Sequence, residues 1–390
     1  MLLFSPPLLA DSKYSFHSEK QLFKYRNKQY ELTVPDGYQF ELMTDRLDGP
    51  RMLSFDAENN LLIASKSGAI YRLAPPYRQA TILAELDNYP HSITVFKNMI
   101  YVAQTDGVYK ADYSPGNEKI SSNKFIKIAS LPDTGGHNSR TLALGTDNLI
   151  YVSLGITANC SDEFLHSSYP FDLRRGGVYV FDPAADETKL KMFANGLRNP
   201  VGFDWHPVSQ IMYSSNNGPD HLGFDLPPEY FSEVTAGSFH GMPWYQYDGD
   251  KIIRDGCIKS KPPYALSKVS KPVATFDARN APMGVAFFPE DSQFSKFANN
   301  AVVALRGSWA TRPSWNAKRA AASRRHPKLM LVVFNQQHRA IAVKEFITGF
   351  QLENGNRLAR PVGVKTGPDG ALYITSDYGI EGLFRLVKIK

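Results

Sequence analysis

A strand–turn–strand pattern that returns six times along the chain is the feature that most restricts its fold. In the clearest copy, residues 49–73, three apolar runs are separated by the turn sequences DAENN and KSG. The other copies begin near residues 89, 139, 198, 281 and 360. Short strands repeated in this way, with no stretch of helical periodicity, are typical of a β-propeller. The sequence therefore predicts an all-β fold, a six-bladed β-propeller.

The two ends of the chain are expected to meet in one blade. A propeller ring closes when a strand from one terminus pairs with the last blade. Residues 38–47, YQFELMTDRL, are predicted to complete the blade that ends at Lys390. Residues 31–390 are then a single propeller domain, preceded by an N-terminal segment, 1–30. Its first residues, MLLFSPPLLA, resemble the remnant of an export signal that lacks a basic start.

Composition excludes several other classes of protein. The 390-residue chain is 43% hydrophobic and 21% charged, which excludes a disordered chain and a coiled coil. Its net charge of +6 is too mild over this length to predict nucleic-acid binding. Apolar runs such as 329–334 are far shorter than the ~20 residues that cross a bilayer, so no integral membrane segment is expected. The two cysteines, Cys160 and Cys257, allow at most one disulfide, and whether they pair is left open.

Cationic and amide side chains recur where the innermost strands of the expected blades begin. In a propeller these positions converge on the central axis although they lie far apart in the chain. Cations gathered there repel one another unless an anionic ligand lies among them. The pattern therefore predicts a pocket for an anion. The residues concerned are Arg51, His91, His137, Arg140, Arg198, Asn199, Arg306 and Arg360.

Several repeats carry insertions, and two of these are singled out for their residues. The first holds Cys160, Asp162 and Glu163, and insertions on one face of a repeat protein usually carry function. The second is a basic stretch at 312–328. It is interpreted either as a border of the substrate entrance or as a disordered surface loop.

Seven motifs, taken in order, resemble a known family. They are GGHNSRTLAL at 135–144, GLRNPVGFDWHP at 196–207, NNGPDHLGFDLPPE at 216–229, HGMPW at 240–244, APMGVAFF at 281–288, ALRGSW at 304–309 and RPVGVKTGPDGALYITSD at 360–377. Together they resemble the quinoprotein sugar dehydrogenases that use pyrroloquinoline quinone (PQQ), and most closely the sorbosone dehydrogenase-like branch. The resemblance runs from about residue 32 to the C-terminus.

The resemblance implies a catalytic role for His137, which would remove the hydroxyl proton of a sugar while a hydride passes to PQQ. A histidine suits this step because its pKa lies close to neutral pH. Arg140 belongs to the same GGH-x-x-R motif and is grouped with it. The family often places an aspartate where this chain has Ile156, so Asp162, Glu163 or a backbone carbonyl must orient His137 instead.

The resemblance also implies a cofactor site and a metal site. Guanidinium and amide groups suit the three carboxylates of PQQ. The residues that match cofactor contacts are Arg198, Asn199, Arg306 and Arg360. Gly218 and Pro219 match residues whose backbone carbonyls bind a calcium ion, and hard oxygen ligands suit that ion. Phe224 departs from the family pattern in this loop, which puts the calcium site in question.

The function predicted from these observations is oxidation of a sugar, an aldose or a sorbosone-like aldehyde, with PQQ as hydride acceptor. Electrons would pass to an external acceptor, because the chain has no CxxCH haem motif. Such enzymes load their cofactor outside the cytoplasm, which implies a periplasmic or secreted protein. Two alternatives stay open: a calcium-dependent lactonase- or esterase-like propeller hydrolase, and a non-catalytic propeller that binds a carbohydrate or a protein.

Overall fold

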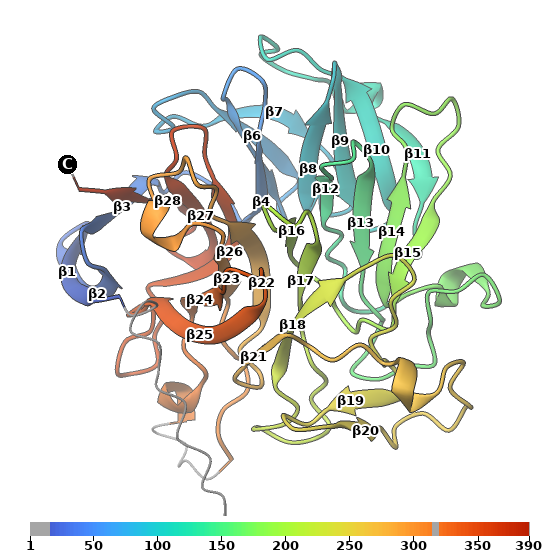
Figure 1. The fold of residues 1–390 in the computed structure, drawn as a ribbon. Coiled ribbons are helices and arrows are strands. Elements are labelled where there is room, and N and C mark those ends of the chain that lie inside the picture. The colour runs from blue at the N-terminus through green and yellow to red at the C-terminus, as the bar shows by residue number, and fades with distance from the viewer. Residues whose placement is uncertain (1–15, 314–319, 390) are drawn as a thin grey trace, which may run out of the picture.

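Six antiparallel four-stranded sheets stand around a central axis in the computed structural model, which describes residues 16–313 and 320–389 (Figure 1). The all-β, six-bladed prediction is confirmed. Within each sheet the strands follow one another by antiparallel pairing from the axis outward.

Each blade has the same four strand positions, from the axis to the rim. The innermost strands are β4 (Pro50–Phe55), β8 (Ser92–Phe96), β12 (Leu142–Leu144), β16 (Phe203–Trp205), β22 (Pro282–Phe287) and β26 (Ala359–Thr366). The second strands are β5 (Leu61–Ser65), β9 (Met99–Gln104), β13 (Ile150–Leu154), β17 (Met212–Asn216), β23 (Ala301–Leu305) and β27 (Leu372–Gly379). The third strands are β6 (Ala69–Leu73), β10 (Gly107–Asp112), β14 (Gly177–Phe181), β18 (Glu229–Val234), β24 (Lys328–Phe334) and β28 (Gly382–Lys388). The outer strands are β7 (Thr81–Glu85), β11 (Ile126–Ser130), β15 (Lys191–Asn195), β21 (Ala274–Phe276), β25 (Ala340–Ile347) and β3 (Tyr38–Thr44).

Two hairpins and several short 3-10 segments lie outside the blades. The hairpins are β1 (Ser18–Tyr25) with β2 (Lys28–Pro35), and β19 (Tyr245–Tyr247) with β20 (Ile252–Arg254). The 3-10 segments are η2 (Ser122–Lys124), η3 (Phe171–Leu173), η4 (Leu266–Lys268), η5 (Ser295–Phe297) and η6 (Ala320–Ser323). No helix within the described ranges, 16–313 and 320–389, is long and apolar enough to span a membrane.

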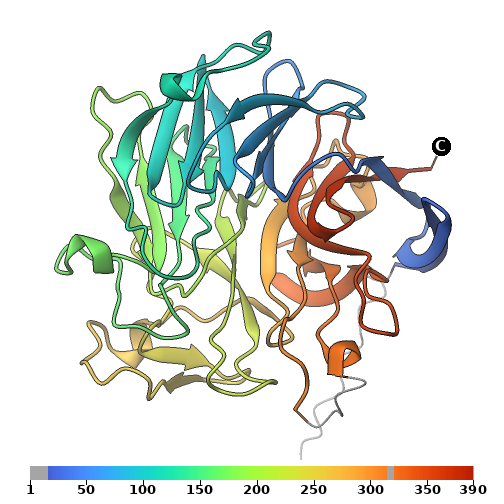
Figure 2. The ribbon, with the colours of Figure 1, turned by 180° about the vertical axis from the view of Figure 1, so that it is seen from behind.

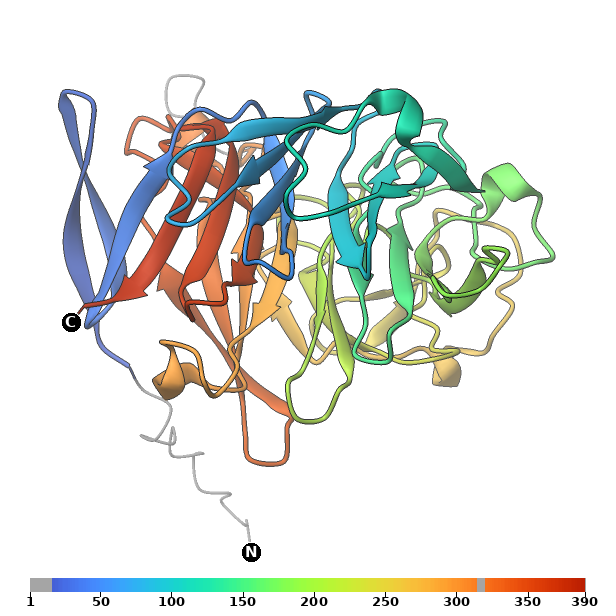
Figure 3. The ribbon, with the colours of Figure 1, turned by 90° about the horizontal axis from the view of Figure 1, so that it is seen from above.

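The ring closes as predicted, because β3 from the N-terminal side pairs with β28 in the last blade. The β1–β2 hairpin stands outside this blade, where Phe23 and Leu32 pack into the same core as Phe40 of β3 (Figure 3). The domain boundary expected at residues 30 and 31 falls inside β2, so the hairpin straddles it. The apolar start interpreted as an export signal lies outside the described residues.

Neighbouring blades pack through side chains that alternate between the two faces of each strand. Side chains of β9 point in turn to opposite faces of its sheet. Ile100 and Val102 pack with residues of β5 and β6 in the preceding blade, whereas Tyr101 and Ala103 pack with residues of β12 and β13 in the following blade. β9 is therefore buried on both faces, whereas the outer strand of the same blade, β11, is largely exposed.

Close approach of the innermost strands explains the recurring Pro-x-Gly sequence. A Cβ on Gly202 would collide with the Met283 carbonyl oxygen, and one on Gly284 would lie 2.6 Å from the Val362 carbonyl oxygen. Only glycine lets neighbouring backbones come this near. The Pro-x-Gly sequences at 200–202, 282–284 and 361–363 thus mark where neighbouring blades meet at the axis.

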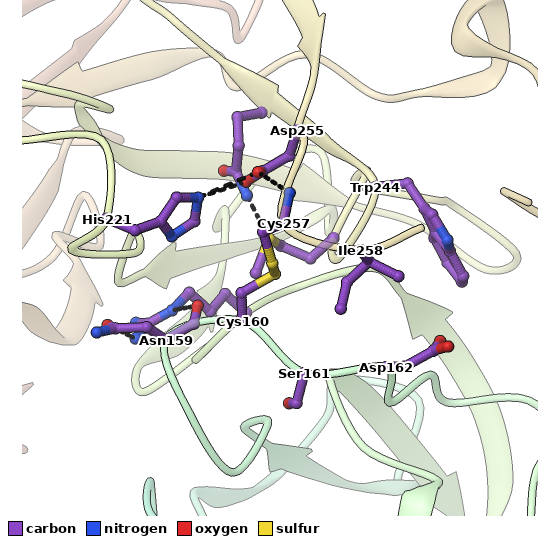
Figure 4. The surroundings of a disulfide bond; sticks show 12 residues. Asn159, Cys160, Ser161, Asp162, His221, Trp244, Asp255, Cys257 and Ile258 are labelled. Carbon is purple, nitrogen blue, oxygen red and sulfur yellow. Dashed lines mark hydrogen bonds and ion pairs between the residues drawn. A yellow bond between two sulfur atoms is a disulfide. The ribbon is translucent and has the colours of Figure 1, made fainter. Parts of the chain in front are cut away.

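The insertion after β13 and the long connection from β18 to β21 pack together on one side of the ring (Figures 1 and 2). They share a small apolar core that includes Phe164, Phe239 and Trp244. A disulfide between Cys160 and Cys257, with Cα atoms 6.4 Å apart, links the two segments (Figure 4). This settles the pairing that the sequence left open.

Candidate functional site

One cavity of about 630 Å³ brings together most of the predicted site residues. Its wall includes His137, Arg198, Asn199, Arg306 and Arg360, which come from four different blades. Gly218 also lines it. Arg51, His91, Arg140 and Pro219 are not among the lining residues. The expected convergence of cations therefore holds for part of the set only.

His137 is held in one tautomer by the backbone. It adopts a left-handed conformation with φ 50°, and its Nδ1 contacts the carbonyl oxygen of Ile156. A carbonyl can only accept, so Nδ1 carries the proton and Nε2 keeps its lone pair. Burial, and then the nearby charge of Arg198, lower the pKa of His137 to about 4. The ring is therefore neutral at neutral pH.

The group that orients His137 is thus a backbone carbonyl, one of the three candidates named from the sequence. Glu163 instead accepts hydrogen bonds from the Thr157 backbone N–H at 2.7 Å and from the Ser161 hydroxyl at 2.6 Å. Asp162 accepts one from the Ser260 hydroxyl at 3.2 Å. Neither carboxylate contacts the imidazole.

Arg140 lies behind the loop that carries His137. Its guanidinium donates to the backbone carbonyls of His137 at 2.6 Å, Pro132 at 2.8 Å and Thr105 at 3.2 Å. The side chain is fully buried, and burial, with the charge of Arg175, lowers its pKa to about 9. The geometry makes Arg140 a positioning residue that fixes the backbone of His137.

Arg198 is anchored by the disulfide-linked insertion. Its Nε donates to the Asn159 backbone carbonyl at 2.8 Å and its Nη2 to the Asn159 side-chain oxygen at 2.9 Å. Its Nη1 donates to the Asn217 carbonyl at 3.1 Å. Burial lowers its pKa to about 10. Asn159 directly precedes Cys160, so the loop that anchors Arg198 is also the loop that the disulfide holds (Figure 4).

Arg306 and Arg360 differ in how their charges are balanced. Arg306 makes a two-pronged ion pair with Asp377, at 2.8 and 3.0 Å. Arg360 donates to the backbone carbonyls of Arg306 and Gly307, both at 2.7 Å. Its Nη1 is buried and has no hydrogen-bond partner within the described part of the chain. Burial and the charges of Arg306 and Arg357 lower its pKa to about 8.

Arg51 and His91 do not line the cavity but take part in a buried network that reaches it through Asp377 and Arg306. Arg51 Nη1 pairs with Asp377 at 2.5 Å, and its Nη2 donates to His91 Nε2 at 3.2 Å. Burial holds the pKa of His91 well below its usual value, so the ring is neutral and can accept this bond. Asp377 therefore balances two of the recurring cations, Arg51 and Arg306.

Four further residues of the site were not singled out from the sequence. Asp377 is the final residue of the last of the seven motifs. It could have been found in the sequence as an acidic residue that faces the cations predicted at the axis. Trp309 covers the cavity wall, with Arg360 lying 4.1 Å from its ring centre. Arg279 and Glu229 also line the cavity. A signal for Arg279 was present, because Arg-Asn-Ala-Pro-Met-Gly at 279–284 repeats Arg-Asn-Pro-Val-Gly at 198–202.

The loop assigned to calcium is occupied by a side chain of the protein itself. The Arg279 guanidinium donates to the backbone carbonyls of Pro219, Asp220, Gly223 and Leu226. The calcium expectation needed the Pro219 carbonyl for the metal, and here it accepts from a cation already. The residues present thus do not fit a calcium ion bound through Gly218 and Pro219.

The basic insertion borders the cavity in its described part. Thr311 and Pro313 line the cavity. Arg325 lies 4.6 Å from the ring centre of Phe224 and pairs with Asp225 at 2.6 Å. Residues 314–319 lie outside the described residues.

The fold and the site together define the class of protein. It is a β-propeller whose axial cavity is cationic and contains a neutral histidine oriented by a backbone carbonyl. The sequence model of the TrAA12-like family matches residues 32–227, just over half of the chain. The protein belongs to the TrAA12-like family.

Relatives by sequence are distant. An uncharacterised protein of Borreliella burgdorferi is 26% identical over 364 residues, which is 89% of each chain. A pyrroloquinoline quinone-dependent sugar dehydrogenase of Hypocrea jecorina is 24% identical over 226 residues, 53% of this chain and 52% of that protein.

Solved structures share the fold. The calcium structure of a Trichoderma reesei member of carbohydrate-active enzyme family AA12 has a TM-score of 0.75 at 18% identity, covering 91% of this chain and 96% of that one. The holo form of the PQQ domain of pyranose dehydrogenase from Coprinopsis cinerea has a TM-score of 0.70 at 19% identity, covering 92% and 97%. At these identities the likeness establishes the architecture alone.

Proposed function

We propose that the protein is a PQQ-dependent dehydrogenase that oxidises a sugar, either an aldose or a sorbosone-like aldehyde. The observation that carries the proposal is one cavity that holds both a neutral histidine with a free Nε2 lone pair and several buried guanidinium groups. The sugar dehydrogenase and pyranose dehydrogenase names of the relatives support the same activity.

The cationic wall fits a polyanion. Arg360 has a buried N–H donor without a partner in the described residues and a pKa lowered partly by two neighbouring arginines. Carboxylates placed there would satisfy the donor and relieve the repulsion. Arg198, Asn199, Arg306 and Arg360 are the residues that would hold PQQ. When bound, PQQ supplies the acceptor for the two electrons that leave the sugar as a hydride.

His137 would act as the base. Its Nε2 takes the proton of the substrate hydroxyl while Nδ1–H stays on the Ile156 carbonyl, which keeps the ring oriented. A pKa of about 4 in the empty cavity makes the ring a weak base. An anion bound beside Arg198 would cancel the repulsion that lowers this pKa, and so bring it closer to the working pH.

Electrons would leave to an external acceptor, and the protein would work in the periplasm or outside the cell. The Cys160–Cys257 disulfide supports that location, because disulfides persist in oxidising compartments. Calcium is not part of this proposal, since Arg279 holds the Pro219 carbonyl.

The hydrolase alternative needs free carboxylates that bind a metal and activate water. In the described cavity, Glu229 accepts from the Gly218 backbone N–H at 2.5 Å, and its burial raises its pKa to about 7. Asp220 contacts Arg279, and Asp377 is paired with Arg51 and Arg306. This pairing disfavours hydrolysis.

The test is a titration of the purified apoprotein with PQQ, followed by quinone absorbance, and then reduction of an artificial dye with a panel of aldoses. Saturable binding and sugar-dependent dye reduction are expected. Arg198→Ala should weaken PQQ binding. Absence of PQQ binding would refute the proposal and favour the propeller hydrolase or the non-catalytic propeller that binds a carbohydrate or a protein.

A further inference from the structure

A guanidinium group lies where the family resemblance places a metal ion. Four backbone carbonyls of the loop 219–226 accept hydrogen bonds from Arg279, at 2.8 Å for Asp220 and 3.2 Å for Leu226, with Pro219 and Gly223 closer. The Asp220 carboxylate contacts the same group. A set of hard oxygens converging on one point is the environment that proteins otherwise use for Ca²⁺.

We propose that Arg279 replaces the divalent cation in this protein, so that a built-in guanidinium completes the anion site and the cofactor binds without metal. The inference rests on the proposed function for the identity of the anion. It goes beyond that function because it assigns a cofactor-positioning role to Arg279.

Burial and anchoring make Arg279 a fixed part of the site. Its side chain is only 6% exposed, so its charge is not dispersed into solvent. Arg279 has φ 71°, a left-handed conformation, and lies three residues before strand β22. The side chain lines the same cavity as His137 and Arg198.

Glu229 secures the geometry from the other side. Its carboxylate accepts from the Gly218 backbone N–H at 2.5 Å and from the Ala281 backbone N–H at 3.4 Å. One acid therefore ties the carbonyl-rich loop to the segment that carries Arg279. The loop is held by protein groups throughout, and none of these contacts needs a metal.

A guanidinium and a calcium ion cannot both use the Pro219 carbonyl at close range, because two cations would then lie side by side in a buried site. Arg279 supplies one charge, and because both of its Nη atoms already donate to loop oxygens, it acts on a bound anion through that charge and by holding the loop in place. A metal would supply two charges and direct coordination. The site should therefore bind its anion with no response to chelators.

The first experiment uses the wild-type apoprotein. PQQ is titrated after dialysis against a chelator and again with added Ca²⁺, and the affinity is read from quinone absorbance. We expect the two affinities to agree. A PQQ affinity that appears only with Ca²⁺ would overturn the proposal.

The second experiment removes the guanidinium. Arg279→Ala should lower PQQ affinity roughly 10- to 100-fold, because it removes a buried positive charge and leaves the loop carbonyls without their donor, and added Ca²⁺ should restore part of it. The control is Arg325→Ala, because Arg325 pairs with Asp225 of the same loop but does not line the cavity. Its PQQ affinity should stay at the wild-type value. Equal affinity in Arg279→Ala and wild type would refute the role of Arg279.

A third measurement needs no PQQ and so separates this inference from the proposed function. Calorimetric titration with Ca²⁺ alone should show binding to Arg279→Ala apoprotein that wild type lacks. That result supports the replacement even if PQQ fails to bind. Absence of any gained Ca²⁺ binding contradicts it. If Arg279→Ala does not fold, Arg279→Gln removes the charge while keeping a polar side chain, and the same outcomes apply.

Discussion

One methyl group added at Gly155 tests whether close packing beneath the cavity holds His137 and Asn199 in place. Gly155 is buried, directly follows β13, and has a φ outside the left-handed region, so alanine adds steric contact without backbone strain. The new Cβ would lie 2.6 Å from Asn199 Oδ1 and 2.9 Å from His137 Cβ. Both separations are shorter than van der Waals contact, so both side chains must move.

The size of the effect follows from these contacts. Overpacking of a buried site costs about 1–3 kcal/mol. With an unfolding entropy of about 2.1 cal/mol/K per residue over 390 residues, Gly155→Ala should lower Tm by about 1–4 °C. A shift of His137 approaching about 1 Å should lower sugar turnover about 100-fold.

The assay combines thermal unfolding of the apoprotein with dye-linked turnover at saturating PQQ. Gly116→Ala is the control, because Gly116 is exposed and its added Cβ meets nothing within 4 Å. The control should match wild type in both measurements. Wild-type Tm and turnover in Gly155→Ala would refute the claim that this contact positions His137 and Asn199.

Three other predictions follow from the charges and the covalent link. Arg360→Ala should weaken PQQ binding about 10- to 100-fold, because it removes the buried Nη1 donor that has no partner in the described residues; unchanged affinity in a PQQ titration would contradict this. The pKa of His137 is about 4 in the folded protein and about 6.5 when unfolded, so protonation of the unfolded chain lowers the stability of the wild type as pH falls from about 6.5 to 4. Urea unfolding should therefore show that His137→Gln loses less stability than wild type between pH 7 and pH 5. Equal losses would contradict this. Replacing both Cys160 and Cys257, 97 residues apart, by serine should lower the free energy of unfolding by up to about 4–5 kcal/mol in the same assay. The loop that anchors Arg198 would then be less fixed, so PQQ binding should also weaken. Unchanged stability and affinity would refute both effects.

Sequence reasoning reached the architecture because blade repeats are local patterns. The turn sequences and the apolar strands each depend on neighbours within one blade. Closure by residues 38–47 followed from the same logic, since an unpaired last blade needs one more strand. The convergence of His137, Arg198 and Arg360 followed from their equivalent positions in the repeat.

Partner choice at the site was decided by tertiary structure. The sequence could not show that Arg140 would bond backbone carbonyls behind His137, or that the Ile156 carbonyl would orient the imidazole. Nor could it show that Arg279 would reach the Pro219 carbonyl, 60 residues earlier in the chain. Composition and spacing determined which blades form and which cations approach the axis. Whether each cation meets an acid, a carbonyl or an open cavity depends on the path of the loops between blades, which no local pattern records.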